Sequence, residues 1–377
     1  MIRYLSYGLL AFIAGTGTIY GQSTWTQQLS GTSESLLGVG YGNGGFGVAS
    51  DSTIFRSPDG ATWVQSTSSS SYLYRGMGYT GTHWFAPSVY SNGKIHLSAS
   101  LPILPLVQID DNPNAYYSAV ASGNGTLVSV GWSGKIDTST NGGRTWTTSA
   151  SPTGEDLVDV LFDGTSFIAL GLQGIILQSS DGLFWNIKGN VGSSFFSQLT
   201  ADLEFGQGSY VACSFSGTYR STDLVNWTRW TGNGIRSLNA VEYANGKFVG
   251  VGDAGKVVTS SDGGISWDSI DSGVSANLEG IAFGNGFWVA VGQNGVVIRA
   301  PEDETPTEDI ALTIHPAAEI RWLSSASYTY QVKWSFDMIQ WFDFGLPITG
   351  DGAMHSVFDT TRDNRKKVYR VVGTQNL

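Results

Sequence analysis

The chain has 377 residues, of which 50 are glycine and one is cysteine, and its net charge is −11. A single cysteine cannot form an internal disulfide, so a hydrophobic core must hold the fold. An acidic chain repels phosphate backbones, which argues against a nucleic-acid partner. Glycine without a triplet period excludes collagen, and the 41% hydrophobic content excludes wholesale disorder.

The first residues have the features of a secretory signal. Arg3 precedes a short apolar run over residues 5–15, and small residues follow up to Gly21. This run is too short to span a membrane, and no later run reaches the roughly 18 to 20 apolar residues that a span needs. We predict a signal peptide over residues 1–21, no transmembrane segment, and a mature protein exported to the periplasm or the extracellular space.

A pattern of about 40 residues repeats through the middle of the chain. LNAVEYANGKFVGVG at 238–252 matches LEGIAFGNGFWVAVG at 278–292, and weaker copies begin near residues 36, 74, 117, 157 and 200. Each unit holds four short β-type runs separated by NG, DG or GG turn signals. Seven such units predict an all-β fold, a seven-bladed β-propeller over residues 22–300.

The last unit lacks the sequence of its fourth strand. It stops at Ala300, whereas residues 24–31 (TWTQQLSG) match the missing ending. We expect this N-terminal strand to complete the last blade and close the ring, because an open ring would leave unpaired sheet edges.

Five units end in a shared motif, S-x-D-x-G-x-(S/T)-W or a close variant. Its members are Ser57, Asp59 and Trp63; Ser139, Asn141 and Trp146; Ser179, Asp181 and Trp185; Ser221, Asp223 and Trp227; and Ser260, Asp262 and Trp267. Short polar side chains bond the backbone of tight turns, glycine adopts positive φ, and tryptophan packs beside the next strand. We predict that these residues form structural turns rather than catalytic or metal sites.

The repeats resemble the Asp-box, or BNR, repeats of sialidases and related propellers over residues 24–300. The sialidase resemblance implies six blades, converging arginines and an Arg-Ile-Pro motif, and the chain contains no such motif. Endoglucanases that share the box use two tandem propellers, whereas one fits here. Photosystem II assembly factors are similar in blade count, and that resemblance implies a chaperone-like binder rather than an enzyme.

Two acidic residues interrupt the row of small residues in the first strands. Asp159 and Asp202 stand where other units have Gly38, Ala119 or Gly280. First strands converge on the propeller axis, so both carboxyl groups are expected to face the channel. Two interpretations stay open: solvated aspartates in a wet channel, or a pair that binds a cation or shares a proton.

The loops opposite the box turns vary from blade to blade. Variation on a rigid scaffold is typical of a binding face. The candidate ligand-binding residues on this loop face are Asp51, Trp132, Gln173, Phe215, Asp253 and Gln293. The two aromatic side chains offer flat surfaces for a sugar ring or for a side chain of a protein partner.

The end of the chain differs in composition from the repeats. An acidic, proline-containing linker is predicted over residues 301–309, and short β-type runs over residues 310–377 predict a small β-sandwich. This segment resembles a C-terminal module of exported bacterial proteins through Arg321-Trp322, the run from Tyr330 to Trp341, and Tyr369 to Val371. Trp334 and Trp341 are expected to pack in its core.

Known catalytic patterns are missing from the sequence. The four histidines are scattered without metal-ligand spacing, and neither a G-x-S-x-G nor a phosphate-binding loop occurs. We therefore predict a secreted, monomeric, non-catalytic binding or scaffold protein without a cofactor, which recognises a glycan or a protein. The alternative is an Asp-box glycoside hydrolase, sialidase-like or glucanase-like, which requires two carboxylates roughly 5 to 10 Å apart around an open pocket.

Overall fold

The computed structural model describes residues 24–68, 73–74, 76–81, 83–89, 94–98, 106–108, 116–192, 201–231, 238–302, 313–315, 319–336, 339–358 and 367–376. These residues form two compact units, one over Thr24–Glu302 and one after it. The predicted signal peptide and most of the predicted linker lie outside the described residues. Within the described ranges, no helix has the length and apolar character needed to cross a membrane.

The first unit is a β-propeller of seven four-stranded antiparallel sheets. The first strands of the sheets are β2 (Leu36–Gly42), β7 (Gly78–Tyr79), β12 (Tyr117–Gly123), β16 (Leu157–Phe162), β20 (Asp202–Gly206), β24 (Leu238–Ala244) and β28 (Leu278–Gly284). The second strands are β3 (Gly45–Ser50), β8 (Trp84–Ala86), β13 (Thr126–Gly131), β17 (Phe167–Gly171), β21 (Ser209–Ser214), β25 (Lys247–Gly252) and β29 (Phe287–Gly292).

The outer strands complete each sheet. The third strands are β4 (Thr53–Ser57), β10 (Lys94–Ser98), β14 (Ile136–Ser139), β18 (Ile175–Ser179), β22 (Gly217–Ser221), β26 (Lys256–Ser260) and β30 (Val297–Pro301). The fourth strands are β5 (Val64–Ser68), β11 (Leu106–Gln108), β15 (Thr147–Thr148), β19 (Asn186–Asn190), β23 (Thr228–Arg229), β27 (Asp268–Ile270) and β1 (Thr26–Gln28). A separate pair joins β6 (Leu73–Tyr74) to β9 (Ser88–Val89).

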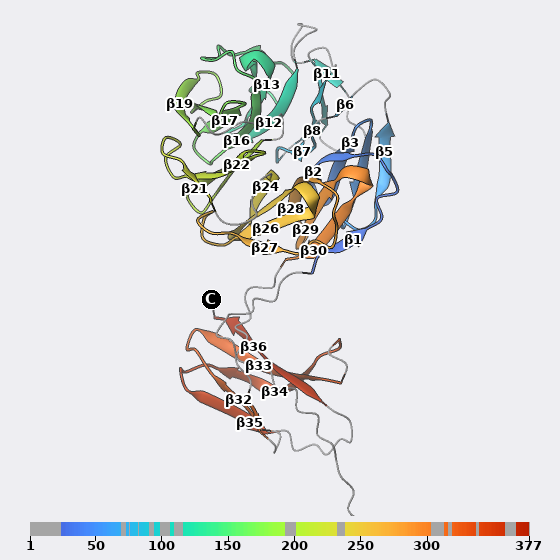
Figure 1. Cartoon of the computed structure of the whole chain (residues 1–377), viewed down its shortest axis with the longest axis vertical. Helices are drawn as coiled ribbons and strands as arrows, with labels where there is room; N and C mark the ends of the chain where they lie inside the picture. The colour runs from blue at the N-terminus through green and yellow to red at the C-terminus, as the bar shows by residue number, and fades with distance from the viewer. Residues whose placement is uncertain are drawn as a thin grey trace, which may run out of the picture. The chain divides into compact units, whose positions relative to one another are not determined.

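Burial follows the radial order of the strands. Second strands such as β29 have nearly every residue buried, whereas fourth strands such as β19 are mostly exposed. Figure 1 shows the first strands around the middle of the propeller and fourth strands such as β19 and β5 at its periphery. Apolar runs of the second strands are therefore packed between neighbouring sheets, as expected for strands covered on both faces.

The two ends of the propeller sequence meet in one sheet. β1 pairs antiparallel with β30, with Thr26 opposite Arg299 and Gln28 opposite Val297. The first and last repeats also touch nearer the axis, where the hydroxyl of Tyr41 donates a 2.6 Å hydrogen bond to Asn285. The Asn285 amide in turn donates to the Pro58 carbonyl at 2.9 Å. Contacts between residues more than 220 positions apart thus join the two ends of the propeller sequence.

Deleting residues 23–31 should prevent stable folding, because the deletion leaves β30 as an unpaired edge. We expect an unfolded or aggregated product by size-exclusion chromatography with light scattering and by thermal melting. A chain that starts at residue 24 is the control and should melt cooperatively. A monomeric deletion product with a cooperative melt would contradict this role of β1.

Glycines at the ends of first strands make room for aromatic rings of neighbouring sheets. A Cβ built at Gly284 would lie 2.0 Å from the ring of Tyr41, and one at Gly42 would lie 2.1 Å from the ring of Tyr79. The same contact joins Gly206 to the ring of Tyr243, at 2.2 Å. Any larger side chain at these glycines would collide with the ring, so glycine here permits close packing of adjacent sheets.

The repeated S-x-D turns connect the third and fourth strands. In the turn after β4, the Asp59 carboxylate accepts hydrogen bonds from the amides of Ala61 and Thr62, both at 2.9 Å. The indole of Trp63 donates to the Gly60 carbonyl. The hydrogen bonds from the backbone, that of Thr62 first, lower the pKa of Asp59.

Four further turns repeat this geometry with small variations. Asn141 replaces the aspartate in one of them, and its side-chain oxygen accepts a hydrogen bond from the Thr145 amide at 3.0 Å. Asp181 and Asp223 each accept two backbone amides within their own turns. The Trp267 indole differs, because its buried N–H has no hydrogen-bond partner. All five carboxyl or carboxamide groups are thus engaged within their own turns.

Replacing Asp262 by alanine should lower the free energy of unfolding by roughly 1 to 3 kcal/mol, because the amides of Ile265 and Ser266 lose their acceptor. The matched control is Asp262→Asn, which keeps an acceptor oxygen, as Asn141 does in its own turn. Chemical denaturation of both variants measures the difference. Equal stability of Asp262→Ala and Asp262→Asn would contradict the turn-forming role.

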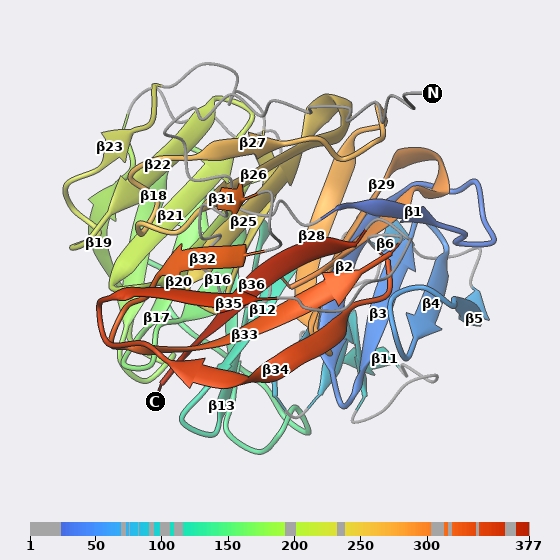
Figure 2. The ribbon, with the colours of Figure 1, turned by 90° about the horizontal axis from the view of Figure 1, so that it is seen from below.

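The second unit contains two three-stranded antiparallel sheets. One holds β31 (Thr313–His315), β32 (Glu319–Leu323) and β35 (Met354–Phe358); the other holds β33 (Tyr328–Ser335), β34 (Phe342–Thr349) and β36 (Val368–Gln375). Figure 2 shows β33 between β34 and β36, as the strand pairing requires. Its buried core includes Trp322, Tyr330 and Val332.

Trp334 and Trp341 lie outside this core, contrary to the expectation from the sequence. Trp334 stacks on Phe342 at the end of β33, with ring centroids 4.9 Å apart. The guanidinium of Arg370 lies 4.3 Å from the ring centroid of Trp341. Both indoles are therefore packed by neighbours at the surface of the module rather than between its sheets.

Candidate functional site

A cavity of about 490 Å³ lies where the first strands of the propeller converge. All seven first strands contribute to its lining, together with Trp132 at the start of the short 3-10 turn η1 (Trp132–Gly134). First-strand residues two positions apart point to the same side of the strand, so alternate residues face the cavity. The repeat itself therefore builds this site, and its chemistry depends on which residues occupy the inward positions.

Asp159 and Asp202 occupy equivalent inward positions on the adjacent strands β16 and β20. Asp159 is opposite Leu170 and Asp202 is opposite Cys213 in the strand register, as Gly38 is opposite Ala49. Both line the cavity. The alignment of the two aspartates made from the sequence thus agrees with the register of the strands.

Each aspartate carboxyl group links its own strand to the next one. Asp159 accepts hydrogen bonds from the amides of Val160 and, in the neighbouring sheet, Leu203, both at 2.8 Å. Asp202 repeats the arrangement with Leu203 at 2.9 Å and Val241 at 2.9 Å. These bonds join β16, β20 and β24 near the axis. A glycine or alanine at the same position has no side-chain acceptor and cannot form them.

Two glutamates continue the acidic wall. Glu204 lies two residues after Asp202 on β20, and Glu242 lies at the equivalent position on β24. Both side chains line the cavity. The neighbouring Phe205 amide lowers the pKa of Glu204, against the larger effect of burial. Glu242 accepts no hydrogen bond from any residue that the structure describes. Four carboxyl groups therefore lie on three consecutive strands.

The pKa values of these carboxyl groups are raised. Burial raises the pKa of Asp159, and burial together with the charge of Asp159 raises the pKa of Asp202 well above its ordinary value. The negative charge on one of these carboxyl groups opposes ionisation of the other, so the two groups ionise at different pH.

The glutamates respond to the same environment. Burial and the charges of Glu242 and Asp202 raise the pKa of Glu204 well above its ordinary value, and burial raises the pKa of Glu242 to about 8. All four side chains keep partial contact with solvent, which they make through the cavity. Burial dominates because the surrounding sheets displace most of the water that would stabilise a charge.

Three of the loop-face candidates reach the mouth of the cavity. Trp132 lines it and packs against Tyr116, with ring centroids 4.9 Å apart. Gln293 donates a 3.0 Å hydrogen bond to Glu279, which lines the cavity. Asp253 accepts a 3.3 Å hydrogen bond from Asn239, another lining residue.

The other loop-face candidates lie farther from the cavity. Asp51 and Phe215 follow β3 and β21 and are exposed, Phe215 by 55%. Gln173 lies one residue further into its loop than the other candidates do. The residue that directly follows β17 is Leu172, whose amide donates to the Asp156 carbonyl, as the Gln293 amide donates to the Asn277 carbonyl. Gln173 therefore lies in the loop after β17, which ends at Gly171, and its part in binding stays a prediction.

The sequence analysis missed Glu204, Glu242, Asn239 and Glu279 as site residues. A signal for the first two was available, since side chains two apart on a strand share a face and Glu204 follows Asp202 at that spacing. Glu242 stands at the equivalent place in the next repeat. Their convergence with Asp159, however, depends on the packing of three sheets around the axis.

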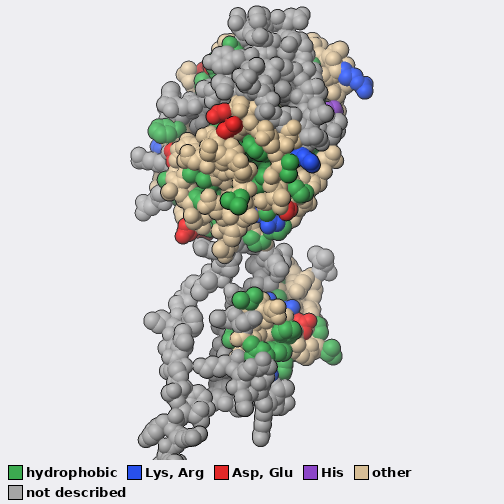
Figure 3. All heavy atoms as spheres, turned by 90° about the vertical axis from the view of Figure 1, so that its right-hand side faces the viewer, with side chains coloured by type: hydrophobic (Ala, Val, Ile, Leu, Met, Phe, Trp, Pro, Cys, Tyr) green, Lys and Arg blue, Asp and Glu red, His purple; other side chains and the backbone are tan. Residues whose placement is uncertain are grey.

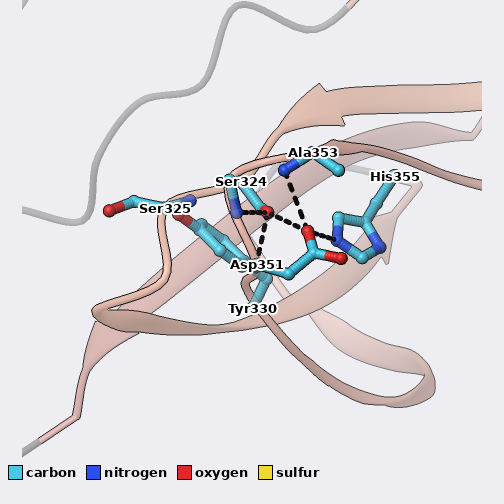
Figure 4. Close-up of polar contacts among 7 residues, drawn as sticks. Ser324, Ser325, Tyr330, Asp351, Ala353 and His355 are labelled. Carbon is cyan, nitrogen blue, oxygen red and sulfur yellow. Dashed lines mark hydrogen bonds and ion pairs between the residues drawn. The ribbon is translucent and has the colours of Figure 1, made fainter.

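The C-terminal module brings a serine, an aspartate and a histidine together (Figure 4). The Ser324 hydroxyl donates to Asp351 at 3.2 Å, and the imidazole of His355 lies 2.9 Å from the same carboxylate oxygen. The serine hydroxyl also accepts the amides of Asp351 and Gly352. Because histidine bonds the aspartate and not the serine, this group lacks the order of a nucleophile and its base, and it fastens a turn.

No metal centre is evident among the described residues. Within those ranges, no group of three or more histidine, cysteine, aspartate or glutamate side chains has the arrangement to hold a metal ion. Each oxygen of Asp159 and Asp202 accepts a hydrogen bond from a backbone amide, which leaves this pair poorly placed to surround a cation.

The fold and the axial cavity define a β-propeller protein with an acidic central channel. No family model matches the chain, and no curated protein matches it. Among solved structures, YCF48 bound to D1 peptide is similar at 17% identity and a TM-score of 0.60, covering 74% of this chain and 96% of that one. YCF48 from Cyanidioschyzon merolae is similar at 18% identity and a TM-score of 0.59, covering 75% and 100%.

An enzyme shares the same fold. A catalytically inactive virginiamycin B lyase from Staphylococcus aureus, with quinupristin, is similar at 11% identity and a TM-score of 0.63, covering 74% of this chain and 99% of that one. Because these identities are low, the similarities establish the β-propeller fold and leave the activity to the residues of the site.

Raising the pH should destabilise the propeller through its channel carboxyl groups. A group whose pKa is higher in the folded state contributes stability at low pH and loses it as the pH rises through the folded value, here about 8 for Glu242. We expect the melting temperature to fall between pH 5 and pH 9, and Glu242→Gln to reduce that fall.

Thermal melts across this pH range, with the exposed Asp268→Asn as the control, measure the effect. The control variant should follow the wild-type curve, because Asp268 lies on the outermost strand β27. Identical pH dependence in wild type and Glu242→Gln would contradict the assignment of a raised pKa to this carboxyl group.

Proposed function

We propose that this protein is an exported, non-catalytic binding propeller that recognises a partner at the mouth of its axial cavity. The observation that carries the proposal is the arrangement of the loop face, where Trp132 lines a cavity built from seven strands and Gln293 and Asp253 bond the lining residues Glu279 and Asn239. Concave sites that combine an aromatic surface with a few oriented polar groups are typical of recognition.

A polypeptide is the favoured partner. The structure of YCF48 bound to D1 peptide supplies the precedent of a similar fold holding a peptide. At the mouth of this propeller, the amide groups of Gln293 and Asn239 are held in place by hydrogen bonds to Glu279 and to the Leu278 carbonyl, so the polar groups that a partner would meet are fixed. On the propeller face in Figure 3, apolar side chains are scattered rather than gathered, which favours the mouth over this flank as the binding surface.

A glycan is the second candidate partner, and one observation favours it. Phe215 exposes 55% of its surface on the same loop face, and an exposed ring is suited to stacking against a sugar. Export, for either partner, depends on the sequence prediction of a signal peptide over residues 1–21. Hydrolysis of a glycan is the alternative function, since carboxyl groups with raised pKa line the cavity.

The test uses residues 22–377 with a panel of polysaccharides and sialosides, and with an extract of the native cell envelope. Retention and released sugar are measured on the same samples. We expect retention of a partner without release of sugar, and we expect Trp132→Ala to weaken retention about tenfold, as for a central aromatic contact. The control is Asp262→Asn, in a turn at the opposite end of the sheet.

Two outcomes would overturn the proposal. Release of sugar would show that the protein is a glycoside hydrolase, and mutation of the cavity carboxyl groups would then test which of them are required for hydrolysis. Equal retention by wild type and Trp132→Ala would remove the mouth of the cavity from the binding surface.

A further inference from the structure

The acidic residues that line the axial cavity are distributed unevenly around it. Carboxyl groups of Asp159, Asp202, Glu204 and Glu242 lie on β16, β20 and β24, whereas glycines such as Gly280, Gly38 and Gly76 hold the equivalent positions in the next three repeats. Glu279 on β28 adds a fifth carboxyl group at the mouth. A Cβ built at Gly76 would meet no atom within 4 Å, whereas one at Gly38 would lie 2.6 Å from the backbone of Gly76. The open space on this wall therefore lies beside Gly76. Four of the carboxyl groups thus lie across the cavity from a wall of glycines and of side chains such as Val39 and Met77.

No positive group among the described residues neutralises this wall. The described residues that line the cavity include no lysine, arginine or histidine. Glu242 is enclosed by protein except toward the cavity, and it accepts no hydrogen bond from any described residue. A carboxyl group that is buried without a partner is costly, and a ligand that supplies a charged donor removes the cost.

We infer that the cavity receives the ammonium or guanidinium group of a lysine or arginine side chain from a polypeptide partner, an inference that rests on the proposed partner-binding function. The four carboxyl groups occupy two levels, two residues apart along the strands, or roughly 7 Å. A long side chain spans such a depth: its aliphatic stem lies along the glycine wall, and its charged end reaches the glutamates.

A bare metal ion fits the same wall less well. Asp159 and Asp202 already direct oxygens at the amides of Leu203 and Val241, which leaves few oxygens free to surround one ion. The mouth also suits a polypeptide better than a lone ion. There, Trp132 and the Glu279–Gln293 pair offer contacts for the residues on either side of an inserted side chain.

The inference predicts a link between binding and protonation. A cation placed beside Glu204 and Glu242 favours their ionised forms and so opposes the burial that raises their pKa values. Other titratable groups near them are Asp159, Asp202 and Cys213, and the remaining strands add Glu279, Tyr41, Tyr79 and Tyr117 to the cavity lining. Binding should therefore release protons from the wall, and affinity should rise between pH 6 and pH 8.5, where lysine and arginine remain charged.

The experiment titrates residues 22–377 with decalysine and decaarginine by calorimetry, with fully acetylated decalysine as the uncharged match. Glu204→Gln/Glu242→Gln is compared with Asp268→Asn/Asp271→Asn, which removes the same number of charges around the outer strand β27. We expect roughly tenfold weaker binding in the cavity variant, near wild-type binding in the control, and proton release that depends on buffer ionisation enthalpy.

Equal weakening in both double variants would overturn the inference, because the attraction would then come from the overall negative charge. Stabilisation by Ca²⁺ without binding of decalysine would also overturn it. The proposed function is tested separately. If a partner is retained through Trp132 and its retention is unchanged in Glu204→Gln/Glu242→Gln, only this inference is contradicted. If decalysine binds but no partner is retained in a manner that depends on Trp132, only the proposed function is contradicted.

Discussion

The close approach of seven first strands to one axis is the constraint on which the propeller depends. Side chains at the axis must be small or must form bonds across it. Glycine meets the first requirement where Gly284 and Gly42 accept the rings of Tyr41 and Tyr79 from the next sheet. The contact between Gly284 and Tyr41 joins the last repeat to the first, so the packing that joins neighbouring repeats elsewhere also joins the two ends of the ring.

Asp159 and Asp202 satisfy the same constraint by the second route. Their carboxyl groups occupy the space between strands and accept amides from both sides, which makes them part of the architecture as well as part of the acidic wall. The protonation state of the wall is therefore coupled to the packing of β16, β20 and β24. Glu204 and Glu242 lie beside this framework with fewer bonds, and so they are the residues most available to a ligand.

Stability and recognition are separated along the strands. The S-x-D turns satisfy their own polar groups within a few residues and carry little chemistry for binding. The opposite ends of the strands hold Trp132, Gln293 and Asp253, which differ among repeats and lie at the mouth of the cavity. A repeated turn at one end and variable residues at the other allow the proposed binding surface to change without loss of the scaffold.

The sequence by itself determined the features that arise from local bonding. The repeats, the strands and the turns around Asp59, Asp181 and Asp262 all depend on contacts within a few residues, and pattern and spacing record such contacts. It also placed Asp159 and Asp202 at equivalent positions, because strand periodicity is local. Only the tertiary structure decided that Glu204, Glu242 and the two aspartates share one wall. That outcome depends on how residues about 40 positions apart pack around an axis, and local pattern carries no record of that distance.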